Sequence, residues 1–534
     1  MGCFIGRLCA GNFQLSIVKN NKNQGGCKNM SYQETYKKWC TDPYFDAQTQ
    51  EELKNLEGNE KEIEDCFYRQ LEFAREATLC LNANGIHTYL FESLRPTPEL
   101  SFAVRELGCI AGIVITASHN PREYNGYKVY WEDGAQITPP HDKNILAEVA
   151  KVTDFSMVKT MEEDEARAEN LFSIIGTDFD DKYIAQLKKQ SIHPEAAKDM
   201  KIVYTPLHGT GNIPVRRVLR ELGFTQVYVV EEQKVPDGNF PTVPYPNPED
   251  KNAWTLALEL AKKVDADIIL ATDPDADRLG VHAKDTKTGE YVSFTGNMSG
   301  MLIAEYILRE RTKTGTMPEN PALVETIVTT DMAKAVAKEY NTALIEVLTG
   351  FKYIGEQIRL FDETGSHHYV FGLEESYGCL AGTYARDKDA PVAVMMLCEV
   401  AAYYKLQGKT LWDAMVELYE KYGYYKEDLA TVTLKGIDGS QKITAMMNAF
   451  RENPPKELGG FKVLACDYKS DCRRDMITGE TTSNVLYYEL ENNAWCCVRP
   501  SGTEPKIKYY FGVKGENFKD AEEKLEALKK AMTE

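Results

Sequence analysis

Short apolar runs alternate with amphipathic stretches along most of the chain. In the first third, compact runs rich in β-branched and aromatic residues occur at Ile86–Phe91, Gly112–Thr116 and Tyr127–Trp131, which favours buried strands. A helix is expected at Glu99–Leu107, between the first two of these runs. This region therefore shows only about three strands, which is few for an α/β domain.

Two further regions repeat the alternation more fully. Strands are expected, in chain order, at Lys201–Leu207, Gln226–Glu231, Ala266–Thr272, Ala322–Val328, Leu344–Leu348 and Tyr369–Phe371. Asn247 and Pro248 predict a helix start, with asparagine as cap and proline in the first turn. Other helices are expected at Ile213–Leu222, Ala390–Leu406 and Leu411–Tyr422. Strands and helices alternating at these lengths predict βαβ units and a mostly parallel sheet.

The last region is dominated by strands, which are expected at Leu429–Lys435, Phe461–Asp467, Asn484–Leu490 and Trp495–Val498, with a final helix at Phe518–Met532. Adjacent residues of a strand point to opposite faces, so Cys496 and Cys497 are expected to pack into the core on two sides. The predicted fold class is α/β, with three mixed α/β domains at residues 30–175, 176–310 and 311–424 and an α+β domain at 425–534. Residues 1–29, rich in Asn, Gly and Lys, are expected to be a disordered or non-native extension before Met30.

Composition narrows the function. With 43% apolar and 27% charged residues, the 534-residue chain has the make-up of a soluble globular protein. A net charge of −19 repels nucleic acid and anionic membranes, yet it leaves room for a small phosphorylated substrate in a local basic pocket. The 13 cysteines form no CxxC pair or zinc-like spacing, which indicates free thiols in a reducing cytoplasm. No apolar run approaches the length of a membrane span.

A serine loop follows the second predicted strand, within the string TASHNPREYNGYKVY. Ser118 stands at the end of that strand beside His119, and Lys128 follows ten residues later in the next strand. A hydroxyl with a neighbouring base and a nearby ammonium suits covalent transfer chemistry. An ordinary Ser/Asn turn is the alternative, and spacing alone does not decide between them.

An acidic loop follows the strand Ala266–Thr272. Its carboxylates Asp273, Asp275 and Asp277 occur at every second position, and an extended segment would place them on one side. Three carboxylates suit an oxygen-preferring cation such as Mg²⁺, although a solvated acidic turn is the alternative. An EF-hand is excluded because Arg278 replaces its invariant glycine and Lys284 its bidentate glutamate.

Three later loops carry ligand-binding residue types. Glu374 and Ser376 combine a carboxylate with a hydroxyl, which suits sugar hydroxyls, although a helix start is an equal reading. Lys388 lies in a run of charged residues and would supply a cation to a ligand, although an exposed charged surface segment is the alternative. The last loop has the residue types of a phosphate site. Gly502 lets backbone amides approach a phosphate, the hydroxyls of Ser501 and Thr503 can donate hydrogen bonds to it, and the guanidinium of Arg499 can bind it bidentately.

Taken together, these strings resemble the α-D-phosphohexomutase family, in the same order and from about Tyr32 to the C-terminus. TASHNPREYNGYKVY is similar to the family's phosphoserine loop, ATDPDADRLGV to its magnesium loop, GLEES to its sugar-recognition loop and RPSGTEP to its phosphate-binding loop. Within the family, the serine and acidic strings look most like the phosphoglucomutase branch that includes phosphopentomutase activity.

The resemblance implies a role for each loop. Ser118 would carry the transferred phosphoryl group, with His119 and Lys128 in acid/base roles, and Lys128 would need a depressed pKa for this. Mg²⁺ would be held by the three aspartates and an oxygen of the Ser118 phosphate. Substrate contacts would come from Arg278, Thr349, Gly350, Glu374, Ser376 and Lys388, and phosphate contacts from the Arg499 loop.

The implied reaction interconverts glucose 1-phosphate and glucose 6-phosphate through a sugar bisphosphate, which is both intermediate and activator. Four domains are expected to surround a central cleft, and the chain is expected to be a monomer. Phosphopentomutase and phosphomannomutase activity are the alternatives within the family.

One departure from the family motivates a different alternative. Between Phe73 and Ala74, family members carry several tens of residues that this chain lacks, so the first domain is expected to be truncated. A sugar-phosphate-binding protein with impaired catalysis is therefore the alternative outside the active mutases.

Overall fold

The computed structural model describes residues 69–122, 124–153, 157–196, 199–434, 437–466, 484–500 and 506–533, so the predicted extension at 1–29 lies outside it. The chain forms two compact units. Unit 1 comprises the described part of Met1–Gln190 together with Lys201–Leu279 and Tyr384–Pro391. Unit 2 comprises Ser191–Met200, Gly280–Thr383 and Val392–Glu534. In the described part of the chain, no helix is long and apolar enough to cross a membrane.

The described part of the first domain carries two separate two-stranded sheets. β1 (Thr88–Phe91) pairs in parallel with β4 (Phe172–Ile175), and β2 (Ala111–Thr116) pairs antiparallel with β3 (Gly126–Trp131). The three expected strands are therefore confirmed. The sequence prediction lacks β4, because its four residues form too short an apolar run to stand out.

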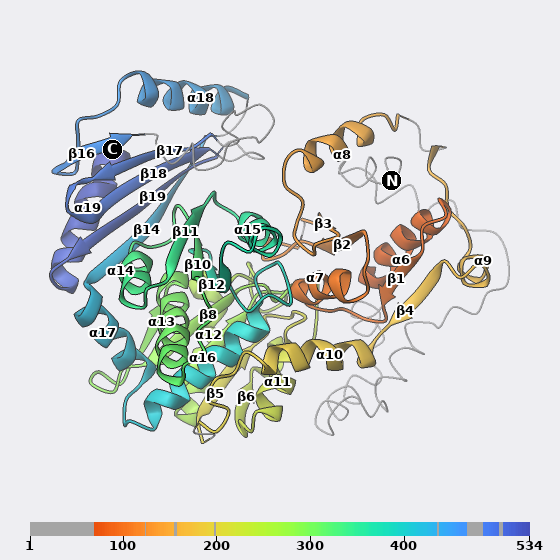
Figure 1. The fold of residues 1–534 in the computed structure, drawn as a ribbon, viewed down its shortest axis with the longest axis horizontal. Coiled ribbons are helices and arrows are strands. Elements are labelled where there is room, and N and C mark those ends of the chain that lie inside the picture. Colours follow the sequence, from red (N-terminus) through yellow and green to blue (C-terminus); the bar gives the residue numbers. More distant parts are fainter. Residues whose placement is uncertain are drawn as a thin grey trace. The chain divides into compact units, whose positions relative to one another are not determined.

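Helices complete this domain (Figure 1): α6 (Arg69–Asn82), α7 (Thr97–Glu106), α8 (His141–Val149) and α9 (Glu163–Ala168). α10 (Thr177–Lys188) then begins the second domain. α7 packs closely on β2, since a Cβ at Gly112 would lie 2.5 Å from Val104 Cγ2. α6 runs without a break through Phe73 and Ala74, the position of the expected missing segment. The truncation of the domain relative to the family stays a prediction.

The second domain places its strand ends side by side. β5 (Lys201–Thr205) pairs in parallel with β6 (Gln226–Val229) and β7 (Ile268–Thr272), and α11 (Asn212–Glu221) and α12 (Thr255–Val264) connect them. Every residue of β7 is buried. The expected strands and βαβ alternation are confirmed, and the acidic loop leaves the carboxyl end of β7, where α/β sheets present ligand sites.

The helix start expected at Asn247 and Pro248 is wrong. Asn247 Oδ1 accepts from Glu249 N at 3.0 Å and closes a turn, and Pro248 O accepts from the Trp254 ring at 2.9 Å. A 3₁₀ turn, η3 (Lys251–Trp254), then precedes α12 and is capped by Asp250. Asparagine favours such turns as strongly as it favours caps, and the local sequence does not separate the two.

The third domain lies in unit 2. The hairpin β8 (Leu279–Lys284) and β9 (Tyr291–Phe294) leads to a sheet of order β11-β10-β12-β13, in which β10 is parallel to both of its neighbours. The sheet strands are β10 (Pro321–Thr326), β11 (Ala343–Val347), β12 (His368–Glu374) and β13 (Gly378–Ala381). Its helices are α13 (Gly296–Thr314), α14 (Met332–Glu339), α15 (Phe351–Thr364), α16 (Ala390–Lys405) and α17 (Leu411–Tyr422). The expected α/β alternation is confirmed.

The fourth domain is a six-stranded antiparallel sheet with two helices (Figure 1). The sheet order is β14-β19-β18-β17-β16-β15, with β14 (Tyr424–Thr433), β15 (Glu457–Leu458), β16 (Phe461–Cys466), β17 (Leu486–Leu490), β18 (Ala494–Pro500) and β19 (Lys506–Gly515). The helices are α18 (Ile437–Glu452) and α19 (Phe518–Thr533). The predicted α+β domain, and with it the overall fold class, is confirmed.

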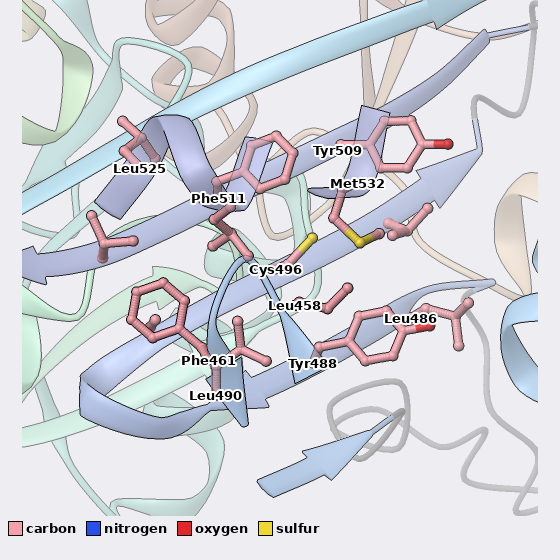
Figure 2. Packing of buried hydrophobic residues seen from close by; sticks show 14 of the residues in the cluster. Leu458, Phe461, Leu486, Tyr488, Leu490, Cys496, Tyr509, Phe511, Leu525 and Met532 are labelled. Atoms are coloured by element: carbon pink, nitrogen blue, oxygen red, sulfur yellow. The ribbon is translucent and has the colours of Figure 1, made fainter. Parts of the chain in front are cut away.

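The central strands of this sheet, β17, β18 and β19, are buried on both faces. Figure 2 shows one face, where Cys496 and Phe511 pack with Leu525 and Met532 of α19. On the other face, Cys497 belongs to a second cluster with aromatic residues of the sheet and with Ile327, Val328, Leu348 and Tyr353 of the third domain. The expected opposite placement of the two adjacent cysteines is thus confirmed.

Candidate active site

The acidic loop forms a compact cluster of carboxylates in unit 1. Asp273, Asp275 and Asp277 are all buried, and one ligand oxygen from each lies within 4.8 Å of the others. The segment is a tight turn, closed by Ala276 N donating to Asp273 O at 2.9 Å, with Ala276 at φ 51°. The predicted cluster is confirmed, but the expected extended geometry is wrong, because a turn rather than a pleat brings the carboxylates together.

Each aspartate uses one oxygen for protein contacts and keeps the other without a hydrogen-bond partner. Asp273 Oδ1 accepts from the backbone of Asp277 and Arg278, at 3.1 and 3.0 Å. Asp275 Oδ2 and Asp277 Oδ2 both accept from Lys128 Nζ, at 2.9 and 3.3 Å. The unpartnered, buried oxygens are Asp273 Oδ2, Asp275 Oδ1 and Asp277 Oδ1.

This arrangement fits a divalent cation. Arg278 Nε lies 3.9 Å from Asp273 Oδ2 and from Asp277 Oδ1, beyond hydrogen-bonding distance. Burial, reinforced by Asp277 and Asp275, holds the pKa of Asp273 well above its usual range. Buried carboxylates need a cation or a proton, and an all-oxygen set is the ligand type that Mg²⁺ prefers.

Cations beside the cluster keep Asp277 ionised. Burial alone would raise the pKa of Asp277, but Lys388, Lys128 and Arg278 outweigh burial and lower it. Lys388 Nζ lies 2.9 Å from Asp277 Oδ2, and Arg278 NH1 donates to Glu249 at 2.9 Å. Of the residues expected to contact substrate, Arg278 and Lys388 therefore lie at the acidic loop.

The serine loop lies in the same unit and is locally strained. Ser118 has φ 53°, a left-handed conformation that is uncommon for serine and is found at functional sites when the surroundings enforce it. Its backbone N–H donates to Thr116 Oγ1 at 2.7 Å, at the end of β2. Ser118 Oγ lies 3.1 Å from His119 Nδ1, so the predicted hydroxyl–imidazole pair is formed.

The two candidate bases differ in charge. Burial, followed by Arg278, lowers the pKa of His119 to about 3, so the imidazole is neutral at physiological pH. Burial would also lower the pKa of Lys128, but Asp275 and Asp277 outweigh it and raise the pKa. The depressed pKa that an acid/base lysine requires is not met in this arrangement, and the role of Lys128 stays a prediction.

Unit 2 holds the residues expected to bind sugar. Glu374 ends β12 and is buried, and Ser376 lies in the turn to β13. Thr349 and Gly350 precede α15, where the Thr349 hydroxyl is buried without a hydrogen-bond partner. Gly350 has φ 116°, which only glycine adopts without strain. Their role in binding stays a prediction.

The expected phosphate loop is described only at its start. Arg499 lies on β18 opposite Lys508 of β19. Ser501, Gly502 and Thr503 lie outside the described residues.

The structure adds polar residues at the acidic loop that the sequence interpretation missed. Thr97 N donates to Asp275 O at 2.9 Å, and Thr97 Oγ1 donates to Asp275 Oδ2 at 3.2 Å. Tyr130 OH donates to Asp387 Oδ2 at 2.6 Å, next to Lys388. Thr97 follows the carboxyl end of β1. Ligand sites in α/β proteins lie at the carboxyl ends of strands, so the same reasoning that identified the other loops could have identified Thr97. Tyr130 carried no such signal, because its partner is far away in sequence.

Comparisons with known proteins give matches along most of the chain. Models of phosphoglucomutase/phosphomannomutase alpha/beta/alpha domains I, II and III match residues 65–155, 181–287 and 295–422. A phosphoglucomutase of Staphylococcus aureus (strain bovine RF122 / ET3-1) is 37% identical over 471 residues, which cover 87% of this chain and 83% of that protein.

Solved structures share the fold. Parafusin, a Paramecium phosphoglucomutase in an open form, aligns with TM-score 0.64 at 18% identity, covering 86% of this chain and 84% of that one. A putative phosphomannomutase from Thermus thermophilus aligns with TM-score 0.62 at 22% identity, covering 86% of each chain. An N-acetylphosphoglucosamine mutase from Aspergillus fumigatus, solved with GlcNAc-6P and magnesium, aligns with TM-score 0.50 at 12% identity, covering 87% of this chain and 93% of that one.

Proposed function

Because the chain belongs to the α-D-phosphohexomutase superfamily, whose members are intramolecular phosphotransferases, we propose that it interconverts glucose 1-phosphate and glucose 6-phosphate. The observation that carries the proposal is that unit 1 contains two reactive features together. One is a strained serine whose hydroxyl lies beside a neutral imidazole, and the other is a buried carboxylate cluster with three unpartnered oxygens. Glucose is favoured over other sugars because relatives that are 37% identical to this chain are phosphoglucomutases.

In the proposed cycle, phosphorylated Ser118 is the phosphoryl donor. The free hydroxyl of the sugar monophosphate attacks phosphorus, the bond from phosphorus to Ser118 Oγ breaks, and the hydroxyl proton leaves to a base. The resulting bisphosphate then reverses its orientation in the site and returns its other phosphoryl group to Ser118 Oγ by the reverse steps. His119 is the candidate for moving the proton, since its neutral ring lies 3.1 Å from Oγ.

Mg²⁺ would be held by Asp273, Asp275 and Asp277 with an oxygen of the Ser118 phosphate, and it would supply Lewis-acid stabilisation of the transferring group. The protein contacts on the other aspartate oxygens support this assignment, because they fix which oxygen of each carboxylate stays available. Lys128 and Lys388 would add positive charge beside the phosphoryl group, whose negative charge they would help to stabilise.

Sugar recognition is assigned to Glu374, Ser376, Thr349 and Gly350, with Arg499 and its loop for the phosphate that is not transferred. The family resemblance supports these assignments, as does the unpartnered buried hydroxyl of Thr349. The central cleft and the monomeric state stay predictions. Phosphopentomutase and phosphomannomutase activity remain the alternatives for substrate, and phosphomannomutase is also named by the matching domain models.

One structural observation favours the other alternative, a sugar-phosphate-binding protein with impaired catalysis. The described part of the first domain, which carries Ser118, has only two separate strand pairs, whereas the second and third domains have larger sheets. A loosely supported serine loop would still leave the metal and sugar loops able to bind ligand.

Two measurements test the proposal first. The intact mass of the purified protein should show one phosphate, and peptide mapping should place that phosphate on Ser118. Coupled assays with Mg²⁺ and glucose, mannose and ribose 1-phosphates then rank the substrates. Ser118→Ala should lose the phosphate and turnover while it keeps its melting temperature, because a loop hydroxyl contributes little to stability. Phosphate on another residue, or turnover that survives in Ser118→Ala, would refute the proposal. Sugar-phosphate binding without turnover in the phosphorylated wild type would establish the impaired protein.

A further inference from the structure

A chain of contacts links the strand β3 to the acidic loop through the segment Tyr384–Pro391. Tyr130 OH donates to Asp387 Oδ2 at 2.6 Å. The other oxygen, Asp387 Oδ1, accepts from the backbone N–H of Lys388 at 2.8 Å and lies 3.5 Å from its ammonium. Lys388 Nζ then reaches Asp277 Oδ2 at 2.9 Å. Asp387 thus joins the phenol to the lysine that contacts the metal loop.

The first link of this chain is deeply buried. Tyr130 is 0% exposed and Asp387 3%, so water does not compete for their hydrogen bond. Burial and the neighbouring Asp387 hold the pKa of Tyr130 well above its usual range, which keeps the phenol protonated and donating. A buried carboxylate that loses its hydrogen-bond donor still carries the desolvation penalty without the compensating bond. The Tyr130 hydroxyl is therefore energetically coupled to the position of Asp387.

The same segment is anchored on both sides of Lys388. On one side, Arg386 N donates to Ser101 Oγ at 2.8 Å. On the other side, Asp389 Oδ2 accepts from Tyr183 at 2.7 Å and from Tyr384 at 2.6 Å. Asp389 therefore has two phenol donors, whereas one phenol donates to Asp387.

We infer that Tyr130 is a positioning residue that holds Asp387 and thereby aims Lys388 at Asp277. Its position on β3 strengthens the inference, because Lys128, two residues earlier, contacts the same oxygen of Asp277 directly. One strand thus sets both ammonium groups that contact Asp277. The catalytic consequence rests on the proposed function, whereas the structural consequence for Lys388 does not.

The decisive variant is Tyr130→Phe, and Tyr183→Phe is its matched control. Both remove one hydroxyl from a fully buried tyrosine in unit 1 that donates to the same segment. The control leaves Asp389 with the hydroxyl of Tyr384. Both variants should lower the melting temperature by a similar amount. A difference between the two variants therefore does not come from a general loss of stability.

The first readout is independent of activity. A brief pulse of an acylating reagent followed by mass spectrometry measures the modification rate of Lys388, with the 84% exposed side chain of Lys519 as internal standard. We expect Tyr130→Phe to raise the rate at Lys388 by about tenfold, because losing a hydrogen bond to a buried charge frees its neighbour. Tyr183→Phe should leave the rate unchanged. Equal rates in both variants, or no change in Tyr130→Phe, would overturn the inference.

The second readout is kinetic. Tyr130→Phe should lower kcat by about tenfold with little change in KM, and it should add nothing further in a Lys388→Met background. Additive losses in the double variant would show that Tyr130 does not act through Lys388. If the wild type lacks mutase activity, the proposed function fails, and the acylation rates still decide whether Tyr130 positions Lys388.

Discussion

Thr97 donates twice to Asp275, through its backbone N–H to the carbonyl oxygen at 2.9 Å and through its hydroxyl to Oδ2 at 3.2 Å. The residue starts α7 and is 1% exposed, so the first domain contributes a fixed donor to the acidic loop of the second. Because Oδ2 is held in this way, Oδ1 of the same carboxylate is the oxygen left for a cation.

Replacing the Thr97 hydroxyl should therefore weaken metal binding. We expect Thr97→Val to lower the affinity for Mg²⁺ or Mn²⁺ by about fivefold, which corresponds to the net contribution of one hydrogen bond, about 1 kcal/mol. Thr97→Ser keeps the hydroxyl and should bind nearly as well as the wild type. Calorimetric titration of the metal-free protein measures both, and equal affinities in the two variants would contradict the assignment.

Asp273→Asn should separate metal affinity from stability. The amide oxygen can keep the bonds from Asp277 N and Arg278 N, while its NH₂ replaces the unpartnered oxygen and removes a buried charge. Metal affinity should fall by at least about tenfold, and the metal-free protein should melt no lower than the wild type, since an unpaired buried carboxylate is costly. Melting curves in EDTA and in excess Mg²⁺ test this. A variant that is less stable in EDTA but equally stabilised by Mg²⁺ would show that the carboxylate serves the fold and not the cation.

The strands and the acidic cluster could be predicted from the sequence because their signals are local. β7 is a buried apolar run, and three carboxylates follow it directly. What could not be predicted is the turn that gathers them, because it depends on Ala276 adopting φ 51°, which alanine seldom does.

Contacts between residues distant in sequence were equally hidden. Lys128 is 147 residues from Asp275, and Tyr130 is 257 residues from Asp387. No pattern in a single sequence connects such positions, although each residue type is visible. The pKa of Lys128 could not be predicted for this reason, since the carboxylates that raise it come from another domain.

Glu427 should make the stability of unit 2 depend on pH. It lies on β14 and accepts from the hydroxyl of Thr330 in the third domain at 2.5 Å. Burial raises its pKa from 4.5 to about 7, with hydrogen bonds from Thr330 and Asn297 opposing the shift and Asp331 adding to it. Between these two pH values the folded state binds more protons than the unfolded state, so stability is highest near pH 4.5 and falls as pH rises to 7.

The contribution of this group is roughly 3 kcal/mol for a shift of this size. Glu427→Gln cannot titrate, so its difference from the wild type in free energy of unfolding should change across pH 4.5 to 7. Denaturant unfolding at several pH values measures the difference. Glu489→Gln, at an exposed glutamate of the same sheet, is the control and should run parallel to the wild type. A Glu427→Gln curve that also runs parallel would refute the prediction.

The first domain should open more readily than the second. Its described strands form two separate pairs, so each pair leaves backbone groups at its edges. Two of its apolar clusters are small: Ala77 and Val149 are the buried members of one, and Leu79, Ala166 and Phe172 those of the other. Tyr89 of β1 and Ile174 of β4 are 41% and 39% exposed, which adds apolar surface in contact with water.

Hydrogen exchange tests this difference in a single sample. Local opening needs less free energy where few apolar contacts hold the strands, so amides from Ile86 to Trp131 should exchange faster than those from Lys201 to Thr272. The second domain supplies the internal reference, because β5 is paired on both sides and β7 is buried throughout. Adding Mg²⁺ should slow exchange in the serine region, since Thr97 and Lys128 connect it to the metal loop. Uniform protection of both domains, combined with turnover typical of the family, would show that the expected truncation has no structural cost.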